Sequence, residues 1–372
     1  MINRLRVKNF KSHKNTELTL GNLTVLSGQN GAGKSSLIQA LLLLRQTDLK
    51  KRLNEILDLN DPLCYIGKTK DALYQYADKD EGDEIAFVLS GSQGEHSWIF
   101  ETSRESTYLR RVNDLIDSEG YEDLPLFSPN FQYISASRNS EYTTNDYEVE
   151  VLRQISLKEG KGELVAQYLV KYGKSLKVIE SLRHNDEPDE FLLSQTTAWE
   201  REISKGVNVN PNTVGENYEI RYSFDTEKYG TTDKFSAKNV GFGLSYSLPV
   251  IVSVLASSPG AILFIENPEA HIHPYGQAKL AELLCLGAQA GIQIIVETHS
   301  DHIINGILVQ CKKFENNGKG INRNNVKIYH FDREEQTHST VYTEIEINER
   351  IRLNNRPLGF FDQMSKDLSS LI

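Results

Sequence analysis

Residues 28–35 read GQNGAGKS. They match the phosphate-binding loop pattern of glycine, four residues, glycine, lysine and serine. An apolar run at 23–26 predicts a strand before the loop, and apolar residues at helical spacing over 35–45 predict a helix after it. Strand, glycine loop and helix in this order are the context of a nucleotide site, so this interpretation is favoured over a purely structural glycine turn.

The chemistry of the loop suits a bound nucleotide. Its glycines let backbone N–H groups turn toward an anion, and the following helix adds the partial positive charge of its N-terminus. The Lys34 ammonium is expected to reach the β- and γ-phosphates, and the Ser35 hydroxyl is expected to ligate Mg²⁺. The sequence therefore predicts ATP and Mg²⁺ as cofactors.

A second nucleotide element is expected at the end of another apolar strand. Residues 261–266 read AILFIE, and NPEAHIHP follows at 267–274. A carboxylate at the tip of such a strand stands beside the phosphate loop and can hold Mg²⁺ through water. Glu266 is the predicted metal-binding and catalytic acid. Glu269 is a second catalytic candidate, within reach of an attacking water, and it is equally well placed as a helix-start carboxylate.

A third strand with polar residues at its end is predicted at 296–300, which read VETHS. His299 can hydrogen-bond the γ-phosphate or the attacking water. A lone histidine is more often structural, but the separation of His299 from Glu266 is what one β–α–β step requires. The spacing therefore favours a catalytic role for His299.

The C-terminal third alternates helices and strands. Helices are predicted over 245–257, 274–290 and 301–311, strands over 261–265 and 293–297, a loop over 312–325, and a hairpin of strands over 326–331 and 339–347. This alternation needs a parallel sheet with helices on its faces, so the predicted fold class is α/β.

The rest of the chain is predicted to be mixed. Strands are predicted over 2–10, 16–20, 85–89, 97–101, 108–112, 131–136 and 218–224, helices over 163–182 and 190–203, and a loop over 206–217. Basic residues at 110–111 and between 158 and 177 could line a nucleic-acid groove, but a solvated helix face is the favoured interpretation.

The composition excludes several classes of protein. The 372 residues are 39% hydrophobic and 25% charged, as in a globular chain of two or three domains. A formal net charge of −10 argues against coating nucleic acid through bulk charge. Three cysteines without CxxC spacing support neither a disulfide framework nor a cysteine zinc site. No apolar run approaches the roughly 20 residues of a membrane span, so a cytoplasmic location without membrane contact is expected.

Four motifs together resemble a known family. The opening LRVKNFKS at 5–12, the phosphate loop, ENPEAHIHP at 266–274 and THS at 298–300 are similar to the RecF/SMC-like branch of ABC-type ATPases. Within that branch, ENPEAHIHP and the tail PLGFFDQ at 357–363 resemble compact ATPases of bacterial antiphage systems, which are Septu PtuA-like and OLD-related without a nuclease domain.

The resemblance implies an ABC-type head that dimerises around two ATP molecules, each phosphate loop facing a signature segment of the other protomer. Residues 240–245, VGFGLS, stand where that signature belongs, unless they are a glycine loop capped by Ser245. The implied nucleotide contacts are Lys11, Ser12, Asn30, Gly31, Ala32, Gly33, Lys34, Ser35, Ser36, Gly243 and Ser245. The head is assigned to 1–48 and 236–372, and an inserted α+β lobe to 49–235, including the strand near 131–136.

Two positions depart from the family pattern. Most ATPases of this branch carry Asp-Glu where this chain has Glu266 and Asn267, so the residue expected to polarise water is an amide. Hydrolysis is therefore expected to be slow, to use Glu269, or to be dispensable. The family also has a coupling glutamine, whose position in this chain is poorly defined. Gln132 is the candidate for it, and would be a further Mg²⁺ ligand.

The predicted function is that of an ATP-binding, slowly hydrolysing ATPase subunit. It would dimerise or form a higher homo-oligomer on ATP, and act as sensor or scaffold for a separate effector, a nuclease or toxin, in bacterial antiphage defence. A separate effector is expected because the residues after His299 lack the spaced acids of a Toprim nuclease. The alternative is a RecF-like DNA-repair ATPase, so nucleic acid stays open as a partner. A small-molecule kinase is disfavoured by the signature-like segment.

Overall fold

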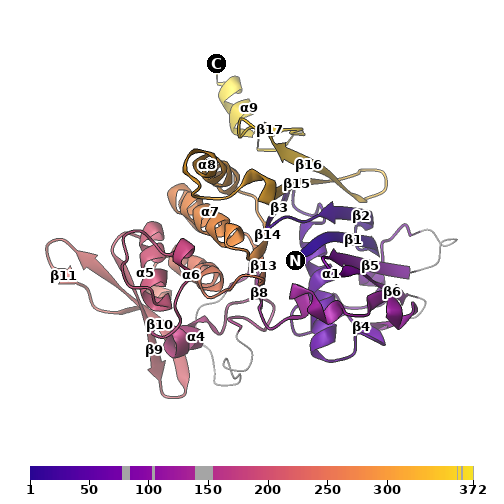
Figure 1. The fold of residues 1–372 in the computed structure, drawn as a ribbon, viewed down its shortest axis with the longest axis horizontal. Coiled ribbons are helices and arrows are strands. Elements are labelled where there is room, and N and C mark those ends of the chain that lie inside the picture. The colour runs from indigo at the N-terminus through magenta and orange to yellow at the C-terminus, as the bar shows by residue number, and fades with distance from the viewer. Residues whose placement is uncertain (78–83, 103–104, 139–153, 358, 362, 372) are drawn as a thin grey trace.

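The computed structural model describes residues 1–77, 84–102, 105–138, 154–357, 359–361 and 363–371. A seven-stranded sheet lies at its centre, in the order β17-β16-β15-β3-β14-β13-β8 (Figure 1). Its strands are β3 (Leu23–Gly28), β8 (Phe131–Ile134), β13 (Ile262–Glu266), β14 (Gln293–Glu297), β15 (Val326–Arg333), β16 (Thr340–Ile347) and β17 (Leu353–Asn354). The strands from β15 to β8 in this order are parallel, and β16 and β17 extend the sheet antiparallel.

The central strands are buried on both faces. In β13, Leu263 and Ile265 enter one apolar core, whereas Ile262 and Phe264 enter a second. Three helices pack on the first face, namely α6 (Phe242–Leu255), α7 (Pro274–Gln289) and α8 (Asp301–Asn317) (Figure 1). Helix α1 (Lys34–Leu49) packs on the second face. Burial on both faces explains why such a strand is a continuous apolar run in the sequence.

A six-stranded sheet covers the other side of α1, in the order β2-β1-β5-β6-β7-β4. Its strands are β1 (Ile2–Phe10), β2 (His13–Thr19), β4 (Ile56–Asp58), β5 (Glu84–Gly91), β6 (Gly94–Glu101) and β7 (Tyr108–Arg111). The second core joins both sheets through α1, because Phe87 of β5 and Phe264 of β13 belong to the same cluster. The phosphate loop therefore stands where the two sheets meet.

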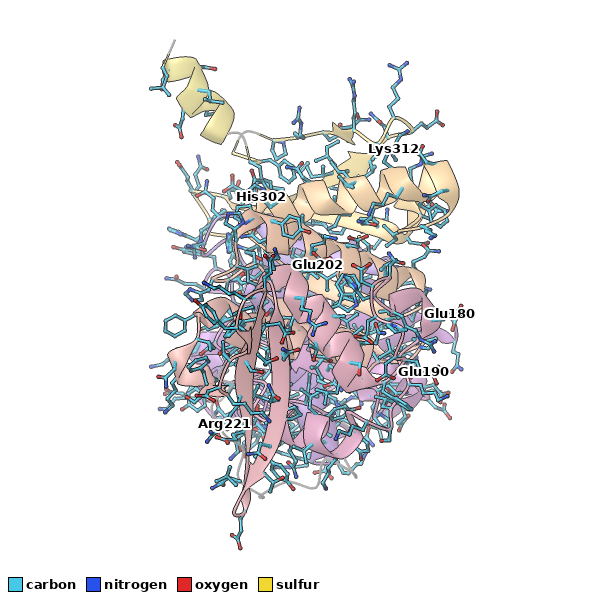
Figure 2. All side chains as sticks on the ribbon, turned by 90° about the vertical axis from the view of Figure 1, so that its left-hand side faces the viewer. Glu180, Glu190, Glu202, Arg221, His302 and Lys312 are labelled. Carbon is cyan, nitrogen blue, oxygen red and sulfur yellow. The ribbon has the colours of Figure 1, made fainter. Side chains whose placement is uncertain are left out.

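A third group of elements flanks α6 and α7. It comprises α4 (Val165–Tyr172), α5 (Leu192–Ile203), β9 (Val207–Val214), β10 (Asn217–Thr226), β11 (Gly230–Thr231) and β12 (Phe235–Ser236). Figure 2 shows the β9–β10 ribbon, which carries Arg221, running beside α5 with Glu202. Glu202 accepts hydrogen bonds from Tyr275 Oη at 2.7 Å and Lys279 Nζ at 3.1 Å, so α5 is tied to α7.

Two further short α-helices are α2 (Thr69–Ala72) and α9 (Gln363–Ser370). Among the described residues, no helix combines the length and apolarity that crossing a membrane would need. Leu358 and Asp362, which belong to the tail motif, lie outside the described residues.

The predicted fold class is confirmed. The structure is α/β, with a glycine loop between β3 of a largely parallel central sheet and helix α1, and with α+β elements inserted between α1 and α6. The division into a head at 1–48 and 236–372 and a lobe at 49–235 stays a prediction. Two features show how closely the inserted elements are joined to the rest: β8 is an edge strand of the central sheet, and β5 pairs with β1.

Three local predictions were wrong. The predicted loop at 206–217 contains strand β9, whose Pro211 is tolerated because β9 pairs only with β10 within the described residues and so leaves an edge free. The predicted helix at 163–182 ends at Tyr172, before Gly173. The predicted loop at 312–325 begins as helix, because α8 continues to Asn317 and ends at a left-handed Gly318.

Candidate functional site

The phosphate loop opens onto a cavity of about 360 Å³, a volume within the range of small-molecule sites. The predicted nucleotide contacts that line it are Lys11, Ser12, Asn30, Gly31, Gly33, Lys34, Ser35 and Ser36. Seven lining residues were not selected from the sequence: Asp71, Tyr74, Gln75, Tyr76, Glu297, Arg333 and His338. Lys11 is held by Gln39, because its Nζ donates to Oε1 at 2.7 Å, and burial lowers its pKa.

Residues far apart in the chain hold the phosphate loop from outside. Thr340 Oγ1, at the start of β16, donates to the buried Ala32 carbonyl at 3.0 Å and lies 2.7 Å from Ser12 Oγ. His13 Nε2 lies 3.0 Å from the Gly33 carbonyl oxygen. Burial lowers the pKa of His13 to about 4, so its ring is neutral at pH 7. We call Ser12, His13 and Thr340 the clasp.

Gly33 leaves no room for a side chain beneath the clasp. Its φ of 101° lies in the left-handed region, and a Cβ there would stand 2.3 Å from Thr340 Oγ1 and 2.9 Å from Ser12 Oγ. Gly31 also has a positive φ, 77°, but a Cβ there would meet nothing within 4 Å. The two loop glycines therefore serve different purposes, since Gly31 is needed for conformation only and Gly33 for both conformation and close packing.

This difference gives the first prediction. Gly33→Ala is expected to weaken ATP binding by about tenfold or more and to lower the melting temperature by several degrees, because backbone strain and displacement of the clasp act together. Gly31→Ala is the matched control, which adds strain without a clash and is expected to have a clearly smaller effect. Titration calorimetry and thermal melting measure both. Equal losses in the two variants would contradict the packing role of the clasp.

Lys34, Ser35 and Glu297 form the centre of the site. Lys34 Nζ donates to the carbonyls of Gly28 and Gln29 at 3.0 and 2.8 Å, and lies 3.7 Å from Glu297 Oε1. Ser35 Oγ donates to Glu297 Oε2 at 2.7 Å. The Lys34 and Glu297 side chains are almost completely buried, and burial lowers the pKa of Lys34. Sequence reasoning missed Glu297, although it ends the strand just before His299.

The sheet order explains why Glu297 takes this position. Strand β14 is the direct neighbour of β3, and Glu297 is in register with Leu26, close to the loop. Glu266 ends β13, one strand further from the loop, where it is in register with Glu297. Its carboxylate accepts from Tyr133 Oη and Ala136 N, both at 3.2 Å. Burial, followed by the charge of Glu297, raises the pKa of Glu266 to about 7.

Arg138 fixes the turn after Glu266, a role that no sequence motif indicated. Its guanidinium donates to the carbonyls of Glu266 at 2.6 Å and Tyr246 at 2.8 Å, and also to that of Asn267. Burial lowers the pKa of Arg138 to about 10, which still leaves it charged at pH 7. Asn267 has a φ of 44°, a left-handed conformation that Asn adopts more readily than Glu.

Glu269 and His299 are brought together by direct contacts. Glu269 Oε1 accepts from the His299 backbone N–H at 2.7 Å, and Oε2 accepts from Thr298 Oγ1 at 2.8 Å. Partial burial and the charge of Lys34 lower the pKa of His299, which keeps the imidazole neutral at pH 7. The two predicted catalytic residues therefore stand at adjoining strand ends beside the phosphate loop.

Gln132 does not fit the predicted role of Mg²⁺ ligand. It is in register with Leu263 of β13, which aligns through β14 with Leu23 at the start of β3, so it lies at the end of the sheet opposite Gly28. Its Oε1 accepts from the Ile155 backbone N–H at 3.1 Å. The structure corrects this prediction, because the Gln132 side chain binds the backbone at residue 155 and not the phosphate loop.

The predicted signature residues lie apart from the phosphate loop of their own chain. Gly243 and Ser245 are in the first turn of α6, and in the part of the chain described no hydrogen bond or ion pair joins them to that loop. A Cβ at Gly243 would stand 3.0 Å from the His271 carbonyl oxygen. Phe242 beside them is 72% exposed. The segment thus presents a glycine-rich helix start and an aromatic ring to solvent.

The donor set at the loop fits a magnesium ion. Mg²⁺ takes oxygen ligands, with few protein groups and the phosphates of a nucleotide among them. The Ser35 hydroxyl and the Glu297 carboxylate are the two such groups in contact at the loop. These two residues would hold the ion, and the role predicted for Glu266 remains a prediction.

Two family models match the chain. The model described as "AAA domain, putative AbiEii toxin, Type IV TA system" matches residues 23–305. The model described as "Protein of unknown function (DUF3696)" matches residues 321–371, which include the Thr340 arm of the clasp.

Curated relatives and solved structures are also similar. The chain is 24% identical over 352 residues to "Old nuclease" of Escherichia phage P2, covering 82% of this chain and 58% of that protein. It thus spans little more than half the length of that relative. It is 22% identical over 332 residues to "ATP/GTP phosphatase" of Helicobacter pylori (strain ATCC 700392 / 26695), covering 82% and 86% of the two chains.

An SmcHead bound to the C-winged helix domain of ScpA aligns over 94% of this chain and 98% of its own, with 15% identity and a TM-score of 0.49. The SMC head domain from Thermotoga maritima aligns over 93% and 99%, with 11% identity and a TM-score of 0.47.

Proposed function

Since the chain belongs to the family described as "AAA domain, putative AbiEii toxin, Type IV TA system", we propose that it is an ATPase subunit that dimerises on ATP and controls a separate effector in bacterial antiphage defence. The observation that carries the proposal is the contact of Ser35 with Glu297 beside Lys34. An ammonium, a hydroxyl and a carboxylate at a glycine loop are the groups that bind a nucleoside triphosphate with Mg²⁺.

The roles in hydrolysis follow from the positions of the side chains. Lys34 binds the β- and γ-phosphates. Ser35 and Glu297 would hold Mg²⁺, which would supply positive charge against the phosphates when bound. Glu269 accepts the proton of the attacking water, and His299 contacts the γ-phosphate. Asn267 cannot accept a proton, so turnover is slow compared with the median enzyme rate of about 10 per second.

The dimer is proposed from the accessible start of α6. Phe242 is exposed, Gly243 and Ser245 beside it are half-buried, and the helix N-terminus offers backbone N–H groups to an anion. A second copy that brings its phosphate loop and bound ATP to this segment would complete both sites. Homodimerisation is then a consequence of nucleotide binding.

The second prediction tests this arrangement. Ser245→Arg is expected to leave the monomer folded but to prevent the ATP-dependent dimer, because it places bulk and a charge in a tight interface. Ser258→Arg is the matched control, since Ser258 is exposed just beyond the other end of α6. Light scattering with and without ATP and Mg²⁺ measures the mass. A dimer that persists in Ser245→Arg would show that α6 does not form the interface.

The relatives support the defence context. The family description names a toxin system, and one relative is named a nuclease of a phage. We therefore assign to this chain the ATP-dependent control of an effector, a nuclease or toxin. Co-purification of the native complex identifies that effector.

A DNA-repair ATPase of RecF type is the second candidate function, and one surface favours it. Arg350, Arg352 and Arg356 line a cleft of about 560 Å³ between α8 and β17, and no acidic residue lines it among the described residues. Three guanidinium groups without an acidic partner in that cleft suit a polyanion. Recombination proteins in the co-purified complex would favour this function, whereas a nuclease or toxin would favour defence.

A further inference from the structure

Two segments that contain no part of the predicted phosphate site also line the nucleotide cavity. One consists of residues 71–76, at the end of α2 and just after it, and the other of residues 333–338, at the end of β15 and in the turn toward β16. The phosphate loop accounts for the recognition of phosphates only. A nucleotide also carries a ribose and a flat aromatic base, which need different partners.

Tyr76 presents an aromatic ring to this cavity. The residue lines the cavity and is 52% exposed, whereas its neighbour Tyr74 is 2% exposed. The two ring centroids are 6.0 Å apart and the ring planes meet at 70°, an edge-to-face contact. One ring is therefore packed in the protein while the other is left accessible.

The contacts of Tyr74 fix this pair in place. Its Oη donates to the Thr337 carbonyl at 2.8 Å, and its backbone N–H donates to the Asn9 carbonyl at 2.9 Å. Tyr74 therefore joins the segment 71–76 to both β1 and the β15–β16 turn. Tyr76 therefore packs its ring edge-to-face against a residue that is anchored on two sides.

We propose that Tyr76 is the stacking platform for the base of the bound nucleotide, and that Gln75, Arg333 and His338 face the edges of that base or its ribose. The inference rests on the proposed nucleotide-binding function and identifies the part of the site that recognises a purine nucleoside. Every base has an aromatic face, so stacking on Tyr76 accepts adenine and guanine alike. Gln75 can donate and accept hydrogen bonds, which also suits either purine edge.

The third prediction tests the platform with ligands that carry or lack a nucleoside. Tyr76→Ala is expected to weaken both ATP and GTP by about 5- to 150-fold, the loss that corresponds to about 1–3 kcal/mol of base stacking. Inorganic tripolyphosphate, which has no base, is expected to bind Tyr76→Ala and the wild type within about twofold. Tyr76→Phe keeps the ring and is expected to retain wild-type affinity for both nucleotides. Calorimetry with Mg²⁺ present gives each constant.

The controls separate this inference from the function on which it rests. Tyr108→Ala removes a tyrosine of similar exposure, 49%, that lies on β7 and does not line the nucleotide cavity, and it is expected to change no affinity. Wild-type protein that binds neither nucleotide would overturn the proposed function. Wild-type binding that Tyr76→Ala leaves unchanged, or a loss equally large for tripolyphosphate or for Tyr76→Phe, would overturn the stacking role alone.

Discussion

Lys34→Ala is expected to weaken ATP binding by at least about 100-fold. The Lys34 side chain is 3% exposed. Its ammonium donates to two carbonyls of the loop and lies 3.7 Å from the Glu297 carboxylate. A hydrogen bond to a charged group contributes about 1.5–3 kcal/mol, and this ammonium contacts two phosphates in the proposed complex. Calorimetry on folded protein measures the affinity.

The control for this variant is Lys312→Ala. Lys312 is a half-exposed lysine on α8, labelled in Figure 2, and it does not line the nucleotide cavity. Its replacement is expected to leave ATP affinity unchanged. Unchanged affinity in Lys34→Ala itself would show that the nucleotide does not bind at the glycine loop. It would then contradict the site on which the proposed function rests.

Glu269→Gln is expected to lower the rate of ATP hydrolysis by about 10²–10⁴-fold, the usual contribution of a general base. The amide keeps the shape of the side chain and an oxygen that can accept from the His299 backbone N–H, but it cannot accept a proton from water. ATP affinity should therefore change little while turnover falls. Phosphate release at saturating ATP gives the rate, and calorimetry gives the affinity.

One control and one further variant accompany Glu269→Gln. Glu346→Gln, at an exposed position of β16, is the control and is expected to leave the rate unchanged. Asn267→Glu restores the acid of the family pattern, but it places glutamate at a φ of 44°. A large acceleration in Asn267→Glu together with an unaffected Glu269→Gln would show that the water lies at position 267 and that Glu269 only holds Thr298 and His299.

Local motifs selected candidate residues at the ends of apolar strands. The glycine loop, Glu266 and His299 were selected in this way, and the structure places their strands next to one another in one parallel sheet. The partner of Ser35 was missed, because the sequence does not show which acid-tipped strand lies next to β3. The observed order places β14 between β3 and β13, so Glu297 rather than Glu266 contacts the loop.

Long-range contacts were beyond the reach of pattern analysis. Tyr76 follows no motif, and its accessibility depends on Tyr74 reaching Thr337 of a distant turn. Strand β9 contains Asn and Pro, which favour a loop by composition, but Val207 and Val209 alternate into the core. In such cases tertiary packing overrides local preference.

The clasp also determines when the nucleotide site can form as the chain is synthesised. Thr340 and Ala32, which it joins, are 308 positions apart. A ribosome that adds about 5–20 residues per second needs roughly 15–60 s to make that interval. During that time the nascent glycine loop lacks the hydroxyl that holds it, and a contact of such sequence separation also slows the folding search. Nucleotide binding is therefore acquired late in biogenesis, after β16 has left the ribosome and docked.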